Sequence, residues 1–213
     1  MNVTVFEAIN ITKKYRNTLA LNQVSMSVMQ GDIYGFIGEN GAGKTTMIRL
    51  LTGLAEPTTG KIALFGESNK KLAKQRERIG CIIESPSLYL DMTAYENLEV
   101  QRLQRGIPGK GCIDNALALV GLKDTGKKKA KDFSLGMRQR LALAIALLGN
   151  PEFLVLDEPI NGLDPTGIIE LRNLLKRLNK ERGITILISS HILTELHQLA
   201  NRSVSYTHLT LPT

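Results

Sequence analysis

The most constraining feature of this sequence is a glycine-rich stretch, GENGAGKTT, at residues 38–46. It fits the pattern G-x-x-x-x-G-K-[ST] and follows an apolar run at 33–37. Glycines in such a turn let consecutive backbone N–H groups point inward and form an anion site. A helix that begins near Gly43 adds the positive end of its dipole. The stretch therefore predicts a loop that holds a nucleoside triphosphate, with Lys44 at the β- and γ-phosphates and the Thr45 hydroxyl on Mg²⁺.

Length and composition exclude several other classes of protein. A chain of 213 residues suits one α/β domain with an inserted subdomain. The net charge of +7 permits nucleic acid, nucleotide phosphates or an anionic membrane surface as partner and selects none of them. Cys81 and Cys112 form no CxxC pattern, so we expect inert core thiols in a reducing compartment. There is no signal-peptide pattern and no apolar run near the roughly 20 residues that cross a bilayer, so any membrane role would come through a partner.

The apolar pattern predicts a parallel sheet with crossover helices. Strands are expected at residues 3–9, 21–28, 32–37, 61–65, 80–83, 153–156 and 184–189. Helices are expected after the glycine loop, within 112–120 and 137–148, over 166–178 and from Ile192. Alternating strands and helices indicate a parallel α/β core, and the all-helical stretch from about 86 to 150 indicates a subdomain inserted into it.

A second chemical motif, FLVLDEP, occupies residues 153–159. A buried strand that ends in Asp157 puts a carboxylate at the carboxyl edge of the sheet, where open α/β sheets bind ligands. Asp157 can hold the Mg²⁺ shell, and Glu158 can polarise an attacking water. A base in that position typically contributes about 10²- to 10⁴-fold in rate.

Three further motifs narrow the class of nucleotide-binding protein. These are FSLGMRQR at 133–140, NGLDP at 161–165 and SSH at 189–191, and no [NT]-K-x-D guanine-reading element is present. In this order the motifs resemble those of the ATP-binding-cassette ATPases, over residues 3 to about 202. The stretches IIESPSLY and FSLGMRQRLALA look closest to the exporter subgroup associated with bacitracin and lantibiotic resistance. The resemblance implies an α/β P-loop NTPase (RecA-like) core with an N-terminal antiparallel β subdomain and an inserted helical subdomain.

The resemblance also implies a role for individual residues. Tyr15 matches the aromatic residue that stacks on adenine, Glu158 the catalytic base, and His191 the switch that contacts the γ-phosphate. Ser134 and Gly136 match the signature that touches ATP held by a second subunit, and Asp164 matches the loop that couples the two sites. The phosphate-binding loop is matched by Gly38, Glu39, Asn40, Gly41, Ala42, Gly43, Lys44, Thr45 and Thr46.

Two departures from the family pattern affect this assignment. Where the family usually has a glutamine that senses metal and attacking water, this sequence has Glu84. Its carboxylate can still bind Mg²⁺, together with Thr45 and Asp157, but it adds negative charge beside the γ-phosphate. The signature has Leu135 and Met137 in place of glycine and glutamine. Because Ser134 and the helix N-terminus remain, function is expected to survive.

The resemblance further implies a domain division and partners. Residues 1–202 are expected to form one cassette, with its core at 1–84 and 150–202 and a helical insert at about 85–149. A second ATP-binding subunit would pair with it head to tail, and membrane permease subunits would dock near 86–105. The lysine-rich run KKKAK at 127–131 is expected to be a solvated loop, so no direct nucleic-acid contact is predicted.

The C-terminal segment SVSYTHLTLPT departs from the family, which calls for another apolar strand after QLANR. We therefore expect the native frame to end near Arg202, residues 203–213 to be a non-native tail, and the domain to be truncated at its C-terminus. A sheet without its terminal strands would expose an edge.

Taken together, the sequence predicts the ATP-binding and ATP-hydrolysing subunit of a bacterial exporter, with ATP and Mg²⁺ as its ligands. The subunit is expected on the cytoplasmic face of the membrane. The subgroup that it resembles implies antimicrobial peptides such as bacitracin or lantibiotics as the cargo. One alternative is a soluble cassette ATPase that acts on DNA or ribosomes, which would explain the basic charge. Another is a nucleotide-binding module without turnover, against which Lys44, Asp157, Glu158 and His191 together argue.

Overall fold

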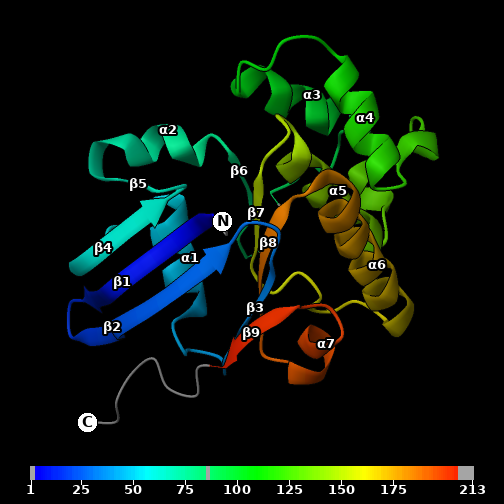
Figure 1. The fold of residues 1–213 in the computed structure, drawn as a ribbon. Helices are drawn as coiled ribbons and strands as arrows, with labels where there is room; N and C mark the ends of the chain where they lie inside the picture. Colours follow the sequence, from blue (N-terminus) through cyan, green and yellow to red (C-terminus); the bar gives the residue numbers. More distant parts are fainter. Residues whose placement is uncertain (1–2, 85–86, 206–213) are drawn as a thin grey trace.

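Two β-sheets organise the computed structural model, which describes residues 3–84 and 87–205. The first is antiparallel and four-stranded, in the order β2-β1-β4-β5. Its strands are β1 (Thr4–Tyr15), β2 (Thr18–Met29), β4 (Thr59–Leu64) and β5 (Glu67–Ser68). The long β1–β2 hairpin lies on one side of the molecule (Figure 1).

The second sheet has five strands in the order β6-β7-β8-β3-β9, and every pair in it is parallel. Its strands are β3 (Ile33–Ile37), β6 (Ile79–Ile82), β7 (Phe153–Leu156), β8 (Thr185–Ser190) and β9 (Arg202–Ser205). All residues of β3, β7 and β8 are buried, as expected for the inner strands of a parallel sheet that is covered on both faces.

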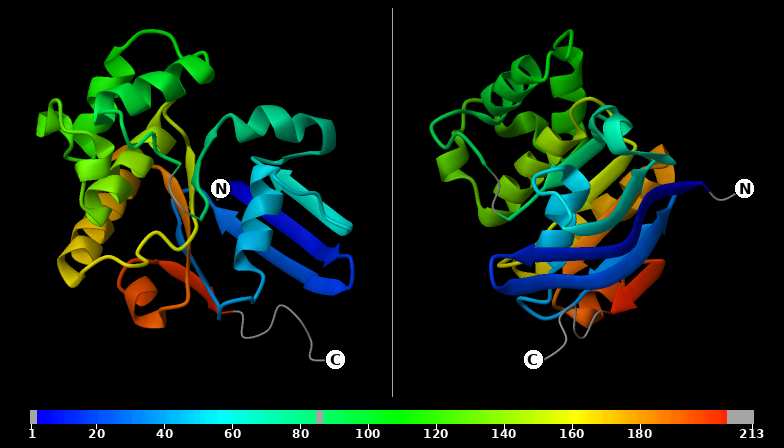
Figure 2. Two further views of the ribbon diagram at one scale, coloured as in Figure 1. Left: turned by 180° about the vertical axis from the view of Figure 1, so that it is seen from behind. Right: turned by 90° about the vertical axis from the view of Figure 1, so that its left-hand side faces the viewer.

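Helices cover this parallel sheet and form the insert. They are α1 (Lys44–Thr52), α2 (Leu72–Arg76), α3 (Ala94–Gln104), α4 (Gly111–Leu119), α5 (Leu135–Leu147), α6 (Pro165–Arg182) and α7 (Leu193–His197), with 3₁₀ turns at Asn69–Lys71, Lys123–Thr125 and Ala130–Asp132. Figures 1 and 2 show α3 and α4 on one side and the antiparallel sheet on the other, with the parallel sheet between them. In the described part of the chain, no helix combines the length and the apolar character needed to cross a membrane.

Side chains at the helix starts explain where three of these helices begin. Thr93 accepts from the Glu96 N–H while the Glu96 carboxylate accepts from the Thr93 N–H, a reciprocal capping box at the start of α3. Ser134 caps α5 through the Met137 N–H, and Asp164 caps α6 through the Gly167 N–H. Two of the three capping residues are thus ones that the sequence assigns to a functional site.

The hydrophobic core has two parts. One is enclosed by the antiparallel sheet, α1 and one face of the parallel sheet, and includes Phe6, Phe36 and Phe153. The other joins the opposite face to α5, α6 and the helical insert, and includes Leu98 and Leu141. The parallel sheet is therefore clamped from both faces, which holds the loops at its strand ends in fixed positions.

The predicted fold class is confirmed, with a parallel core, an N-terminal antiparallel sheet and helices between β6 and β7. Two expectations are wrong. Cys81 is exposed, because it lies on β6 at the edge of the sheet. A strand does follow Asn201, since the backbone of 202–205 pairs with the open edge of β3.

Contacts of Asn201 and of Arg202, the first residue of β9, hold the chain against this edge. The Asn201 side chain accepts from the Ile33 N–H at 2.9 Å, and the Arg202 guanidinium pairs with Asp32 at 3.2 Å. These contacts deliver the chain to the edge of β3 without an apolar sequence pattern. The rest of the expected non-native tail, 206–213, lies outside the described residues.

Candidate nucleotide-binding site

The glycine loop connects the carboxyl end of β3 to α1, as the sequence predicts. Gly41 and Gly43 have φ angles of 83° and 90°, values that favour glycine. Lys44 is buried, and its ammonium donates to the Gly38 carbonyl at 2.6 Å and to the Glu39 carbonyl at 3.0 Å. The lysine charge is therefore held inside the loop, where phosphate oxygens would meet it.

A buried hydrogen-bond network links the start of α1 to β7 and β8. Asp157 is 3% exposed and accepts from the Thr45 hydroxyl at 2.7 Å and from the Ser189 hydroxyl at 2.6 Å. Ser189 in turn accepts from the Glu158 N–H at 2.9 Å. The sequence prediction brought Thr45 and Asp157 together correctly but gave Ser189 no role, although it sits in the SSH motif.

Glu158 lies between two of the other predicted residues. One carboxylate oxygen is 3.2 Å from the Lys44 ammonium, and the other is 2.9 Å from His191 Nδ1. Within the described residues, the oxygen that faces Lys44 is buried and accepts no hydrogen bond. Glu158 also has a φ of 48°, an uncommon value for a non-glycine residue. A buried acceptor with spare capacity and a strained backbone are both features that concentrate at functional sites.

The donors near Thr45 fit Mg²⁺. This ion prefers oxygen ligands and keeps several waters, so it is usually held by one or two protein oxygens plus substrate phosphates. Thr45 and Asp157 supply a hydroxyl and a carboxylate that already touch. No group of three or more His, Cys, Asp or Glu side chains suited to a metal occurs in the described ranges, so an all-protein cage is not offered there.

Glu84 does not join this network. Its side chain is exposed and pairs with Arg49 on α1, and its backbone φ is 61°. No hydrogen bond or ion pair connects it to Thr45 or Asp157 among the described residues. In this structure Glu84 therefore pairs with Arg49 and not with the Thr45–Asp157 pair, and its addition to the metal ligands stays a prediction.

The signature residues gather in a different place. Ser134, Gly136 and Asp164 line a hollow of about 480 Å³ between the start of α5 and the start of α6. None of the glycine-loop residues lines it. Tyr15 lies apart from both groups, at the end of β1, and is 40% exposed. The chain thus brings Lys44, Thr45, Asp157, Glu158 and His191 together and leaves the signature facing outward.

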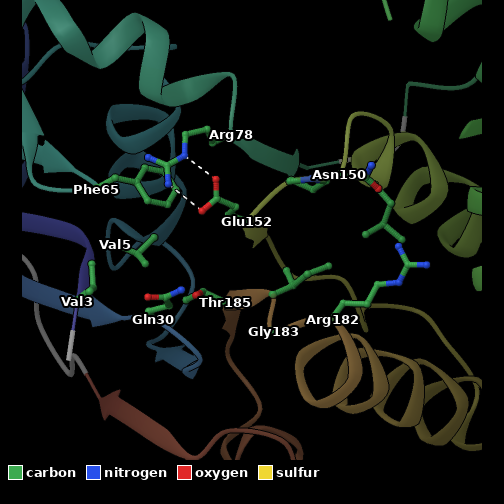
Figure 3. A pocket seen from close by; sticks show the side chains of 13 residues that line it. Val3, Val5, Gln30, Phe65, Arg78, Asn150, Glu152, Arg182, Gly183 and Thr185 are labelled. Atoms are coloured by element: carbon green, nitrogen blue, oxygen red, sulfur yellow. Dashed lines mark hydrogen bonds and ion pairs between the residues drawn. The ribbon is translucent and has the colours of Figure 1, made fainter. Parts of the chain in front are cut away.

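A larger cavity of about 730 Å³ lies at the opposite edge of the parallel sheet. It is lined near the amino ends of β7 and β8 by Glu152 and Thr185, whereas the glycine loop, Asp157 and His191 follow the carboxyl ends. Figure 3 shows Arg78 paired with Glu152 beside the Phe65 ring. None of the predicted site residues lines this cavity.

A glycine loop, a strand-end Asp and a Lys–Glu–His chain at the carboxyl edge of a parallel sheet define a P-loop nucleoside-triphosphate-binding protein. Residues 21–161 match the family described as ABC transporter. The chain belongs to the ABC transporter family, and the resemblance drawn from its motifs is confirmed.

Individual relatives agree with this assignment. The bacitracin transport ATP-binding protein BcrA of Bacillus licheniformis is 51% identical over 199 residues, which are 93% of this chain and 65% of the relative. The lantibiotic transport ATP-binding protein SrtF of Streptococcus pyogenes is 44% identical over 192 residues, 90% of this chain and 82% of the relative. The chain thus spans slightly less than two thirds of the length of BcrA.

A solved structure supports the fold. The dimeric ATP-binding cassette MJ0796 in a post-hydrolysis state, bound to ADP and Pi, superposes with a TM-score of 0.81 at 26% identity. The match covers 95% of this chain and 94% of that one. The predicted P-loop NTPase fold is therefore confirmed over nearly the whole chain.

Proposed function

We propose that this chain is the ATP-binding and ATP-hydrolysing part of a bacterial exporter for antimicrobial peptides of the bacitracin or lantibiotic type. The observation that carries the proposal is the chain of contacts Lys44–Glu158–His191 beside the Thr45–Asp157 pair. Two transport ATP-binding relatives of the same subgroup, at 51% and 44% identity, support the choice of cargo.

Each residue of the loop edge has a distinct task in this proposal. Residues 38–46 surround the phosphates with backbone N–H groups, and Lys44 adds a positive charge at the β- and γ-phosphates. Thr45 and Asp157 hold Mg²⁺, which neutralises charge on the phosphate oxygens when it is bound with the nucleotide. Glu158 polarises the attacking water, and His191 fixes the Glu158 carboxylate and contacts the γ-phosphate. Tyr15 stacks on adenine.

The signature hollow is proposed to complete the site of a second subunit. Ser134 and Gly136 would meet ATP on that subunit, and Asp164 would couple the two sites. The outward position of this hollow supports the idea, because no glycine-loop residue of the same chain lines it. A cassette of the same fold forms a dimer with ADP and Pi bound. Electrostatic stabilisation from both subunits suits phosphoryl transfer, which depends mainly on positioning and charge.

Permease subunits are proposed to dock on the helical insert, around 86–105, at the cytoplasmic face of the membrane. Tyr89, Leu90 and Leu103 are exposed large apolar side chains in this segment. Exposed apolar surface of this kind is available for contact with a partner protein. In the same proposal, residues 1–202 act as one cassette whose insert spans about 85–149.

The test is the Glu158→Gln variant, with Glu181→Gln as a control on the exposed surface of α6. We expect Glu158→Gln to bind ATP with Mg²⁺ while its hydrolysis falls by at least about 10²-fold, the loss typical of a missing base. Glu181→Gln should match the wild type in both assays. Near-normal hydrolysis by Glu158→Gln would remove Glu158 from its proposed role.

A further inference from the structure

We propose that Lys13 positions the adenine-stacking ring of Tyr15. Lys13 itself touches neither phosphate nor base in this proposal; it acts through the tyrosine. The idea rests on the proposed function, in which Tyr15 binds the adenine of ATP.

The two side chains lie on the same face of β1. Residues two apart in a strand point to the same side, and the Lys13 ammonium lies 4.7 Å from the centre of the Tyr15 ring. This separation is within the roughly 6 Å over which a cation is attracted to an aromatic face. One face of the ring is thus occupied by a charge of the protein itself.

The ammonium is also anchored from a second direction. It donates to the Glu56 carbonyl at 2.7 Å, in the loop that follows α1. The same loop is tied to β1 by the Thr58 N–H, which donates to the Thr12 carbonyl at 2.8 Å, and by the Thr58 hydroxyl, which accepts from the Lys14 N–H at 3.0 Å. The hydrogen bond to Glu56 therefore holds the Lys13 ammonium in one position over the ring.

This anchoring matters because Tyr15 is otherwise a strand-end residue that is 40% exposed. An exposed aromatic side chain has to be ordered when a ligand stacks on it, and that ordering weakens binding. A cation held on one face limits the positions of the ring before the base arrives. The exposed part of the ring remains available for stacking, so Lys13 preorganises the adenine site.

The experiment is a double-mutant cycle between Lys13→Ala and Tyr15→Ala, with calorimetric Kd values for ATP and for inorganic triphosphate, each with Mg²⁺. Lys14→Ala is the matched control, because Lys14 is the adjacent lysine and its side chain is exposed. Lys13→Arg keeps a cation over the ring. Steady-state hydrolysis adds KM and kcat for ATP.

We expect Lys13→Ala to weaken ATP binding by about two- to fivefold, the range of an exposed cation–π contact. Triphosphate, which has no base to stack, should bind as it does to the wild type. KM for ATP should rise with kcat unchanged, and Lys13→Arg should restore both values. In the Tyr15→Ala background, Lys13→Ala should have no further effect on ATP binding.

Two results would overturn the inference and leave the proposed function standing: equal ATP binding by Lys13→Ala and Lys14→Ala, or a Lys13→Ala effect that persists without Tyr15 or extends to triphosphate. If the wild-type chain binds no ATP, the proposed function and this inference fail together.

Discussion

The two parts of the candidate site differ in how much of their surroundings the chain itself supplies. At the carboxyl edge of the parallel sheet, the Lys44 ammonium pairs with the Glu158 carboxylate. Asp157 accepts hydrogen bonds from a residue of α1 and from a residue of β8. In the signature hollow, the polar side chains of Ser134 and Asp164 do little more within the described residues than cap their own helices. One part is preorganised by the chain alone, and the other is an open surface.

This difference decides which experiment detects a substitution in each part of the site. A preorganised cluster is disturbed by removal of its internal partners, and the effect appears in a single subunit. An open surface tolerates substitution within its own chain, and the effect appears only when a second subunit is engaged. The predictions that follow separate these two behaviours, in order of decreasing effect.

The largest effect is expected for Ser134→Ala. If Ser134 donates to ATP on a second subunit, its loss removes one stabilising hydrogen bond from the transition state, for which we expect about a 10²-fold fall in turnover. The ATP affinity of the isolated subunit should stay unchanged. Turnover at a concentration that permits dimers, together with Kd on dilute protein, measures the two quantities separately.

Thr93→Ala provides the control for Ser134→Ala. Both residues cap helices in the stretch between β6 and β7, and the loss of either cap costs about 1 kcal/mol of stability. Urea unfolding should give similar losses for the two variants, while only Ser134→Ala loses turnover. Equal turnover losses in the two variants would show that the effect comes from helix stability and would remove the proposed contact between subunits.

The next effect concerns the closed part of the site, through Ser189→Ala. Ser189 is fully buried, donates to Asp157 and accepts from the Glu158 N–H. Partners of metal-binding side chains typically contribute about 10- to 100-fold in metal affinity or activity, and we expect the lower end of this range. The Mg²⁺ concentration that gives half-maximal hydrolysis should rise in the same variant.

Ser190→Ala is its matched control, since the two serines are adjacent, buried and on the same strand. The Ser190 hydroxyl accepts from the Ile192 N–H, and among the described residues no hydrogen bond joins it to Asp157. It should leave the Mg²⁺ dependence unchanged. A shift of the same size in both variants would indicate that β8 packing, and not the Asp157 contact, sets the metal affinity.

Ser189 also shows how far the sequence alone could predict the site. Lys44 and Asp157 can be predicted because each lies in a short, recognisable motif, the glycine loop and the strand that ends in DEP. The link from Ser189 to Asp157 depends on the parallel register of β7 and β8, which pairs Leu156 with Ile188. Those two strands are far apart in the sequence, and neither strand's own residues state which residues of the other will lie beside them.

The same reasoning explains the other misses. Cys81 lies in an apolar run, which predicts a buried side chain. The sequence does not show that this strand forms the edge of the sheet, where the side chain is exposed. The pair between Glu84 and Arg49 on α1 joins residues that are far apart in the sequence, so no local pattern predicts it. β9 forms through backbone pairing and through Asn201 and Arg202 contacts, so side-chain periodicity could not predict it.

The smallest effect is expected at the amino edge of the parallel sheet, in the Arg78–Glu152 pair (Figure 3). The Arg78 hydrogen bond lowers the pKa of Glu152 in the folded protein. A lowered folded pKa means that the stabilisation is present above the unfolded value of about 4.3 and is lost as the pH falls through the folded pKa. Since both side chains are more than a third exposed, solvent screening limits the contribution to about 1 kcal/mol or less.

The urea unfolding free energies of wild type and Glu152→Gln should therefore differ slightly at neutral pH and converge as the pH falls below the unfolded value and through the lowered folded pKa. Glu67→Gln is the control, because Glu67 also forms an ion pair on the surface, with Lys71 four residues along the chain. Turnover per folded molecule should be normal in both variants, since neither residue lies near the carboxyl-end cluster. If fully folded Glu152→Gln loses turnover, a change at the amino ends of the strands affects the catalytic cluster at their carboxyl ends. The Arg78–Glu152 pair would then not be a purely structural contact.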